Sequence, residues 1–225
     1  MDENLQIASE YAPYLLFDEN EPFKVRAIGY TVFKTSGKSE SFRRVIRMDK
    51  KEIQFVIEYA IYFDYDIQHL YELEHVWIYV DTLGKICGCE GSYHGKYINE
   101  MLPERDIVKD KTHVCLYSQP GKHALLPEKR LIYLFPDWKD ACTILAGEDG
   151  FTYPQELYGK PIWITNEEQK MVKKYIYDHY RFVPSMNFIE NRFSLEMFQP
   201  WSELKEQIPK YLEEELKHIK GCYEL

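Results

Sequence analysis

The feature that most constrains the fold is a pair of strand-like stretches in the first half of the chain. Residues 52–66, EIQFVIEYAIYFDYD, are mostly β-branched and aromatic, and residues 72–81, ELEHVWIYVD, have an alternating pattern. Residues of these types suit a pleated surface that is at least half buried. We therefore expect both stretches to be strands in the core of a β-sheet.

Three more stretches have strand character, and turn residues separate them. Residues 85–94, KICGCEGSYH, are expected to form a hairpin with 72–81, closed around Thr82, Leu83 and Gly84. The other two strands are expected at 26–33 and 112–118.

Two stretches in the last third have the pattern of amphipathic helices, residues 166–181 and 202–219. We expect the first to begin with Asn166 as its N-cap and the second with Ser202. Residues recur at helical spacing in both: Met171, Tyr175 and His179 in the first, and Leu204, Ile208, Leu212 and Leu216 in the second. Pro209 lies inside the second stretch, where we expect a kink or an interruption.

These elements together predict an α+β fold. An antiparallel β-sandwich core is expected in the first two-thirds, with amphipathic helices packed outside it, mainly from the last third. The chain of 225 residues is long enough for one sizeable core, and no Gly/Ser-rich linker divides it, so residues 1–225 are expected to form a single domain. The proline-containing segment 135–165 is expected to be rich in loops and to act as a lid over a site or to cover a sheet edge.

The composition excludes several classes of function. A formal charge of −9 argues against a nucleic-acid partner, and the basic cluster Arg43, Arg44 and Arg47 is explained by a solvated strand or turn. No secretory signal is visible, and no apolar run approaches the roughly 20 residues that span a bilayer, so we expect no transmembrane segment. Five cysteines, an odd number, predict free thiols in a reducing compartment, hence a cytoplasmic protein. Cys87 and Cys89 lack a second cysteine pair with which to complete a zinc–thiolate site.

Two glutamates in residues 72–81 point to a cation site. In a strand, Glu72 and Glu74 share one face, about 6–7 Å apart along the strand, while Leu73, His75, Trp77 and Tyr79 share the other. Without a cation the two carboxylates would repel each other, and one would be driven towards protonation. A divalent ion removes that conflict because hard cations bind carboxylate oxygens. His69 could add a nitrogen and Asp66 a further oxygen, with Asp64 as a weaker candidate; the alternative is a solvated pair of glutamates.

Two further histidines lie where strands meet turns. His94 is in SYHG (92–95) and His123 in PGKHA (120–124), and a nearby glycine lets the backbone turn sharply at each place. Because histidine titrates near neutral pH, these two are the candidates for a general acid or base. Taken singly, each could equally have a structural role.

The motifs HLYELEHVWIYV and SYHGKY resemble the core of the necrosis-inducing protein family of plant-associated microbes. That family's hallmark is Gly-His-Arg-His-Asp-Trp-Glu, followed by a strand and Ser-x-His-Gly. A vacuolar protein sorting-associated family is similar in the same core, and YAPYLLFDENEPF (11–23) and VCLYSQPGKHA (114–124) resemble two of its segments. The resemblance covers scattered blocks within about residues 11–125.

The resemblance implies a β-sandwich that holds Mg²⁺ or Ca²⁺. By position, His69, Glu72 and Glu74 match a histidine and two acidic residues of the hallmark, and Asp66 falls near an upstream aspartate ligand. His94 and His123 resemble histidines close to the ion. The match has departures, since Gln68, Tyr71 and Leu73 replace a glycine, a histidine and a tryptophan of the hallmark, and Glu72 replaces an aspartate.

Three functions follow as hypotheses. The first is a protein of unknown specificity that binds a polar head group, a sugar or a phosphate, at a divalent metal site formed by Asp66, His69, Glu72 and Glu74, with Mg or Ca favoured and Zn or Mn also compatible. The second is a metal-dependent hydrolase in which His94 and His123 act as general acid and base. The third is an interaction protein without metal or catalysis. No nucleophile motif or dinucleotide fingerprint decides between them, and the pattern indicates no particular oligomeric state.

Overall fold

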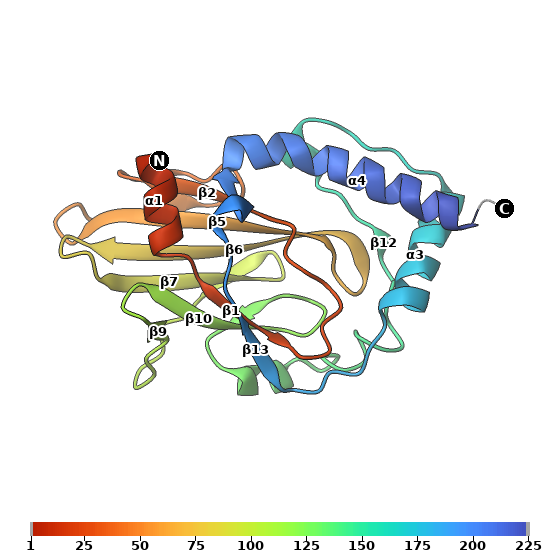
Figure 1. Ribbon diagram of the computed structural model, residues 1–225, viewed down its shortest axis with the longest axis horizontal. Helices are drawn as coiled ribbons and strands as arrows, with labels where there is room; N and C mark the ends of the chain where they lie inside the picture. The colour runs from red at the N-terminus through yellow and green to blue at the C-terminus, as the bar shows by residue number, and fades with distance from the viewer. Residues whose placement is uncertain (1, 224–225) are drawn as a thin grey trace.

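Two β-sheets pack against each other in the computed structural model, which describes residues 2–223 (Figure 1). The larger sheet has the strand order β14-β2-β5-β6-β7-β8, with β12 added beside β6. Its strands are β2 (Ala27–Phe33), β5 (Ile53–Tyr65), β6 (His69–Asp81), β7 (Ile86–Tyr93), β8 (Lys96–Asn99), β12 (Gly150–Phe151) and β14 (Phe198–Pro200). The strands predicted at 26–33, 52–66, 72–81 and 85–94 are confirmed, and β6 begins three residues earlier than expected.

The smaller sheet has the order β11-β10-β1-β13, with β9 paired to β10. Its strands are β1 (Tyr14–Asp18), β9 (Val108–Lys109), β10 (His113–Ser118), β11 (Leu125–Leu126) and β13 (Phe188–Asn191). β10 is the strand predicted at 112–118. The pairs β1–β10, β12–β6 and β14–β2 are parallel, whereas the long central pairs are antiparallel. The fold is therefore α+β with packed sheets, as predicted, although the sheets are not antiparallel throughout.

The helices lie outside the sheets. They are α1 (Glu3–Glu10), α2 (Gln155–Tyr158), α3 (Asn166–Tyr180) and α4 (Trp201–Tyr223), with 3-10 turns η1 (Lys129–Leu134) and η2 (Leu195–Met197). α1 and α4 contact β2, and α3 packs against α4 and β6. In Figure 1, α3 and α4 enclose the end of the sandwich where β5 turns into β6. Most of the helical covering thus comes from the last third of the chain, with α1 as the exception.

The two long helices correct three predictions. α4 begins at Trp201, so Ser202 lies inside the helix and is not its N-cap. The N-cap of α3 is Thr165 and not Asn166, because the Thr165 hydroxyl accepts the Glu168 backbone N–H while the Glu168 carboxylate accepts the Thr165 N–H. α4 continues through Pro209 without interruption. Pro209 removes one helix hydrogen bond, but Leu204, Ile208 and Leu212 are fully buried on the same helix, and their packing holds it together.

The two faces of β6 pack in two different hydrophobic cores. Val76, Ile78 and Val80 lie in the main core, which also includes residues of the second sheet. Trp77, on the other face, forms a small core with Ile46 and Val56, beneath the short hairpin β3 (Gly37–Lys38) and β4 (Val45–Ile46). The alternation predicted for residues 72–80 is therefore confirmed.

The basic cluster on the β3–β4 hairpin is only partly solvated, which corrects the interpretation of Arg44. The Arg44 side chain is 7% exposed, and its guanidinium carbon lies over the rings of both Trp77 (4.4 Å from the centroid) and Tyr97 (3.8 Å). Its Nη2 donates to Glu90 Oε2 at 2.7 Å. Stacking on two aromatic faces and pairing with a carboxylate stabilise a cation that is shielded from water.

Segment 135–165 covers the turn between β5 and β6. The backbone N–H of Gly147 donates to the Ile67 carbonyl, and those of Asp149 and Gly150 donate to the Gln68 carbonyl. β12 then continues the sheet alongside His69 and Leu70. The segment therefore covers a sheet edge, one of its two expected roles. Within residues 2–223, no helix has both the length and the apolar character needed to cross a bilayer.

Candidate metal centre

Asp66 forms the turn between β5 and β6. Its Oδ1 accepts the backbone N–H groups of Gln68 (2.6 Å) and His69 (2.8 Å), and its own N–H donates to the His69 carbonyl (2.9 Å). Aspartate favours turns because its short carboxylate can accept N–H groups two and three residues ahead. The side chain is fully buried, so a negative charge is fixed inside the molecule at the start of β6.

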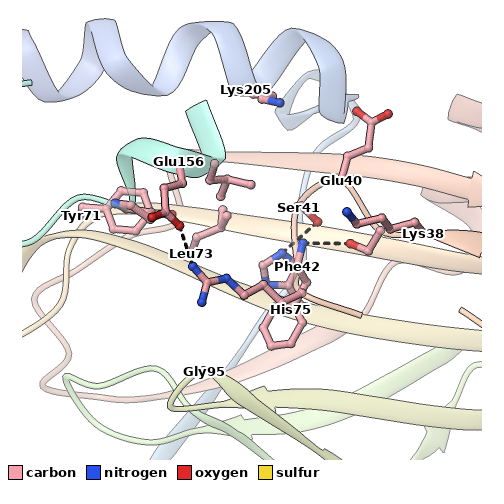
Figure 2. Close-up of a pocket in the computed structure, with 14 residues that line it drawn as sticks. Lys38, Glu40, Ser41, Phe42, Tyr71, Leu73, His75, Gly95, Glu156 and Lys205 are labelled. Atoms are coloured by element: carbon pink, nitrogen blue, oxygen red, sulfur yellow. Dashed lines mark hydrogen bonds and ion pairs between the residues drawn. The ribbon is translucent and has the colours of Figure 1, made fainter. Parts of the chain in front are cut away.

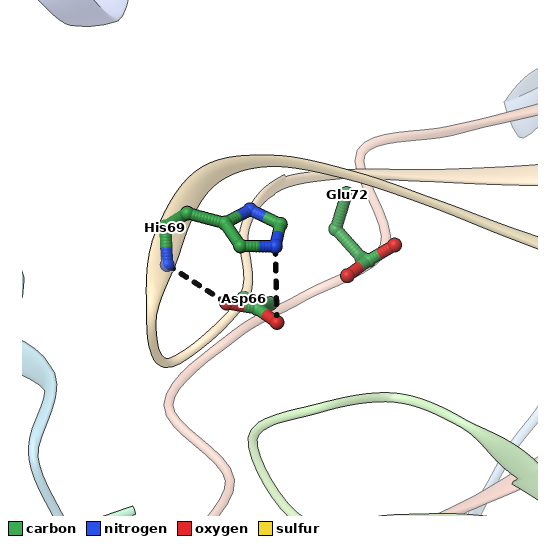
Figure 3. Close-up of side chains that lie close together, drawn as sticks. All are labelled: Asp66, His69 and Glu72. Atoms are coloured by element: carbon green, nitrogen blue, oxygen red, sulfur yellow. Dashed lines mark hydrogen bonds and ion pairs between the residues drawn. The ribbon is translucent and has the colours of Figure 1, made fainter. Parts of the chain in front are cut away.

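His69 and Glu72 bring their side chains to the same place (Figure 3). His69 Nε2 lies 3.4 Å from Asp66 Oδ2. One ligand atom from each of Asp66, His69 and Glu72 lies within 4.8 Å of the other two. A cluster of two carboxylates and one imidazole at this separation has the size and chemistry of a divalent-cation site.

The oxygen and nitrogen donors of the cluster suit a divalent cation. Carboxylates favour Mg²⁺ or Ca²⁺, and an imidazole also suits Mn²⁺ or Zn²⁺. His69 Nδ1 is buried without a hydrogen bond within residues 2–223, but it is Nε2 that faces Asp66 (Figure 3). The fit to an ion therefore rests on the types of donor present and on their convergence.

A lysine that the sequence analysis did not single out also reaches the cluster. Lys122 Nζ lies 2.5 Å from Asp66 Oδ2, and its side chain is 12% exposed. Lys122 is in the loop between β10 and β11, so the contact joins the second sheet to the turn of the first. The ammonium group supplies positive charge where the sequence predicted a metal ion.

The loop can approach this closely because residue 121 is glycine. Gly121 has a φ of +70°, and a Cβ there would lie 2.8 Å from Ile67 Cβ. Its N–H donates to Glu21 Oε2 at 2.7 Å, and its carbonyl accepts the Ile67 N–H at 2.7 Å. The sequence signal for Lys122 was therefore its place in PGKHA, directly after this glycine.

The charges in the cluster act on one another. Burial opposes ionisation of Asp66, but the positive charges of His69 and Lys122 prevail and hold its pKa below the ordinary value. Burial, followed by the neighbouring carboxylates of Glu74 and Asp66, raises the pKa of Glu72 well above its ordinary value. One carboxyl group of the cluster, Glu72, is thus driven towards protonation when no ion is bound, as expected of acids brought together.

Glu74 is on the same face of β6 as Glu72 but outside the group of three. Its side chain accepts a short hydrogen bond from the Ser92 hydroxyl, and Ser92 Oγ also accepts the His75 N–H at 2.6 Å. Burial raises the pKa of Glu74 to about 8, although the Ser92 hydrogen bond acts in the opposite direction. Of the four predicted ligands, the structure therefore brings together Asp66, His69 and Glu72.

His94 is at the turn between β7 and β8, within the electrostatic reach of the cluster. Its ring lies 5.8 Å from that of Phe135 and its φ is +44°. Although His94 is exposed by surface area, the atoms around its ring partly exclude water; this desolvation and the charge of Lys122 lower its pKa, while the Gln119 side chain and the Asp66 charge act in the opposite direction. It is exposed, so solvent or a ligand can reach it.

His123 lies in an aromatic enclosure. The ring is fully buried and stacked on Phe63 at 4.0 Å, with Phe17 and Phe23 edge-on to it. Its Nε2 lies 3.5 Å from Glu21 Oε1. The two candidate acid–base residues are thus placed differently. His94 is accessible to a ligand from solvent, whereas His123 is fully buried.

The chain has no match among protein-family models, curated proteins or solved structures. What the site can do therefore has to be argued from its own geometry.

Proposed function

We propose that Asp66, His69 and Glu72 bind a divalent cation, and that the protein uses this ion to hold a polar head group, a sugar or a phosphate. The convergence of three ligand atoms within 4.8 Å carries the proposal. Carboxylate oxygens favour Mg²⁺ or Ca²⁺, while the imidazole also admits Mn²⁺ or Zn²⁺. Glu74 is the fourth candidate ligand, since it follows Glu72 on the same face of β6.

Lys122 defines the main alternative. Its ammonium lies 2.5 Å from Asp66 Oδ2 and is itself a positive centre. If Lys122 were the only cation needed, the cluster would be a satisfied polar network and the protein an interaction module without metal. If an ion binds, Lys122 opposes it by charge repulsion, and removal of the lysine charge should strengthen ion binding.

Calorimetric titration with Ca²⁺, Mg²⁺ and Mn²⁺, joined to elemental analysis of the purified protein, tests the proposal. We expect Asp66→Asn and His69→Ala to weaken binding at least about tenfold, because each removes one of few ligands. Lys122→Met should tighten it several-fold. Glu206→Gln, an exposed substitution on α4, is the matched control and should bind as the wild type does. Absence of ion binding by the wild type and by Lys122→Met would refute the proposal.

A metal-dependent hydrolase is the second candidate, and the position of His94 favours it. His94 is exposed and within the electrostatic influence of Lys122 and Asp66, so it could exchange a proton with a ligand at the cluster. In the same titrations His94→Ala should keep the affinity for the ion. A loss of turnover without loss of ion binding would assign His94 to catalysis, and binding of sugar or phosphate probes without turnover would favour the binding protein.

We also propose that the protein is cytoplasmic, and its cysteines support this. Cys87, Cys89, Cys115, Cys142 and Cys222 are all free. Free thiols are typical of proteins that work in a reducing compartment.

A further inference from the structure

A pocket lies on the opposite face of β6 from the acidic cluster. It has a volume of about 880 Å³ and lies between the β3–β4 hairpin, β6, α2 and α4 (Figure 2). Leu73 and His75 line it, whereas Glu72 and Glu74 point to the other side of the strand. The volume is in the range of pockets that hold small organic molecules.

Buried polar groups line this pocket. His75 Nε2 lies 3.0 Å from Ser41 Oγ, and Ser41 Oγ donates to Glu58 Oε1 at 2.8 Å. Trp77 Nε1 donates to the other oxygen of Glu58 at 2.7 Å. His75, Ser41 and Glu58 are each at most 4% exposed, and the first two line the pocket.

These contacts fix the tautomer of His75. The Ser41 proton points to Glu58, so Ser41 Oγ must accept the proton of His75 Nε2. Burial, followed by the charge of Arg44, lowers the pKa of His75 to about 3, which keeps the ring neutral. His75 Nδ1 is then a bare acceptor, and it has no hydrogen-bond partner within residues 2–223. Nδ1 is itself shielded in the unliganded structure, so a ligand with an O–H group satisfies it once the neighbouring pocket wall moves aside.

The charged and apolar side chains that line the pocket indicate which other groups its ligand carries. Lys38, Arg43 and Lys205 line the pocket, against two acids, Glu40 and Glu156. Arg43 and Glu156 pair with each other at 2.9 Å, whereas Lys38 and Lys205 make no ion pair in the part of the chain that is described. In a chain with a net charge of −9, this local excess of positive charge favours an anion. The walls are aromatic and aliphatic: Phe42, Tyr71, Leu73 and Leu157.

We propose that this pocket binds a small organic acid with an apolar or aromatic body and a hydroxyl group, the hydroxyl donating to His75 and the carboxylate pairing with Lys38 and Lys205. The site is separate from the acidic cluster and needs no metal ion. It thus adds a second ligand site, for a hydroxylated carboxylic acid, to the proposed function.

Calorimetry or NMR titration with para-hydroxyphenylacetate tests the proposal, with phenylacetate, which lacks the hydroxyl, and tyramine, which lacks the carboxylate, as comparison probes. The wild type should bind para-hydroxyphenylacetate at least about fivefold more tightly than either comparison probe. His75→Phe should bind the two acids equally, because the acceptor is gone while an aromatic ring remains. Lys205→Gln should weaken both acids but not tyramine.

Controls separate this site from the cation site. Lys210→Gln, an exposed substitution on the same helix as Lys205, should leave all affinities unchanged. Addition of a chelator, or the Asp66→Asn substitution, should also leave binding of para-hydroxyphenylacetate unchanged. If His75→Phe does not fold, Lys205→Gln and the comparison of the three probes on the wild type decide the matter. Equal binding of the hydroxylated and plain acids by the wild type, or no binding at millimolar probe, would overturn the proposal.

Discussion

Glu100 is a fully buried carboxyl group that has no hydrogen bond to either oxygen within residues 2–223. It lies over Gly91, where an added Cβ would be 2.3 Å from Glu100 Oε1. Burial raises its pKa to about 9, so the group stays protonated in the native protein at neutral pH. Nothing in the spacing of the sequence distinguished this glutamate from the many exposed ones.

The buried state of Glu100 predicts a pH dependence of stability. Its ordinary pKa is 4.5 and its native pKa is about 9, so the native state holds a proton that the unfolded state releases between these values. This contribution to stability is complete below pH 4.5 and is lost as the pH rises towards 9, at up to about 1.4 kcal/mol per pH unit. Glu100→Gln should abolish this contribution.

Urea unfolding at several pH values between 5 and 8 measures the effect. As the pH rises, the free energy of unfolding should decline less steeply for Glu100→Gln than for the wild type. The exposed Glu206→Gln should follow the wild type, and parallel curves for Glu100→Gln and wild type would contradict the prediction.

Among the individual residues of the candidate site, only some could be predicted from the sequence. Asp66, His69 and Glu72 could be found because parity and turn position are local properties of a strand and its end. The glycine before Lys122 marked a turn, but it could not show that this turn meets Asp66, because Lys122 lies in a loop of the other sheet, 56 residues beyond Asp66. The burial of His123 among three phenylalanines likewise depends on residues from distant elements, which local patterns do not encode.

Among the elements, the long strands and the two long helices were predicted well, since each has a strong periodic pattern. The short strands β1 and β13 were missed because four or five residues give little periodicity, and their parallel or antiparallel pairing is decided by tertiary contacts. Pro209 shows the opposite error. A local rule predicted a kink or an interruption; the helix is not interrupted, because burial of the α4 apolar face outweighs the lost hydrogen bond.

The loop between β10 and β11 gives an element-scale prediction through Gly121. Alanine there would adopt an unfavourable φ of +70° and would also place its Cβ 2.8 Å from Ile67 Cβ and 3.0 Å from Cys142 Sγ. We expect Gly121→Ala to lower the free energy of unfolding by about 2–5 kcal/mol, the sum of the conformational penalty and the overpacking penalty.

The matched control for this substitution is Gly159→Ala. Gly159 has a similar φ of +66°, but a Cβ there would meet nothing within 4 Å. It should therefore show only the conformational penalty, about 1–2 kcal/mol. Urea unfolding of both variants measures the difference, and equal losses would show that the close approach of the loop to Ile67 is unimportant.

On the scale of the whole molecule, the acidic cluster joins two layers. Asp66 and His69 belong to the end of the β5–β6 hairpin in the larger sheet, and Lys122 comes from the loop after β10 in the smaller one. Segment 135–165 closes over the same turn. A cation that binds here would therefore bind only the assembled sandwich, since unfolding separates its ligands from the elements that position them.

Binding to the native state alone predicts a thermal shift. At a Ca²⁺ or Mg²⁺ concentration about 100 times Kd, the native state gains about 2.7 kcal/mol. For a chain of 225 residues this corresponds to a rise in Tm of about 5–10 °C, which a chelator should reverse. Asp66→Asn should show at most about half of this rise, since its affinity is at least about tenfold weaker. Lys122→Met should start from a lower Tm and rise further, because the ion then replaces the lost ammonium. Differential scanning calorimetry of these proteins provides the measurement. If the wild-type Tm is the same with ion and with chelator while Lys122→Met is destabilised in both, then Lys122 is the only cation that this cluster requires.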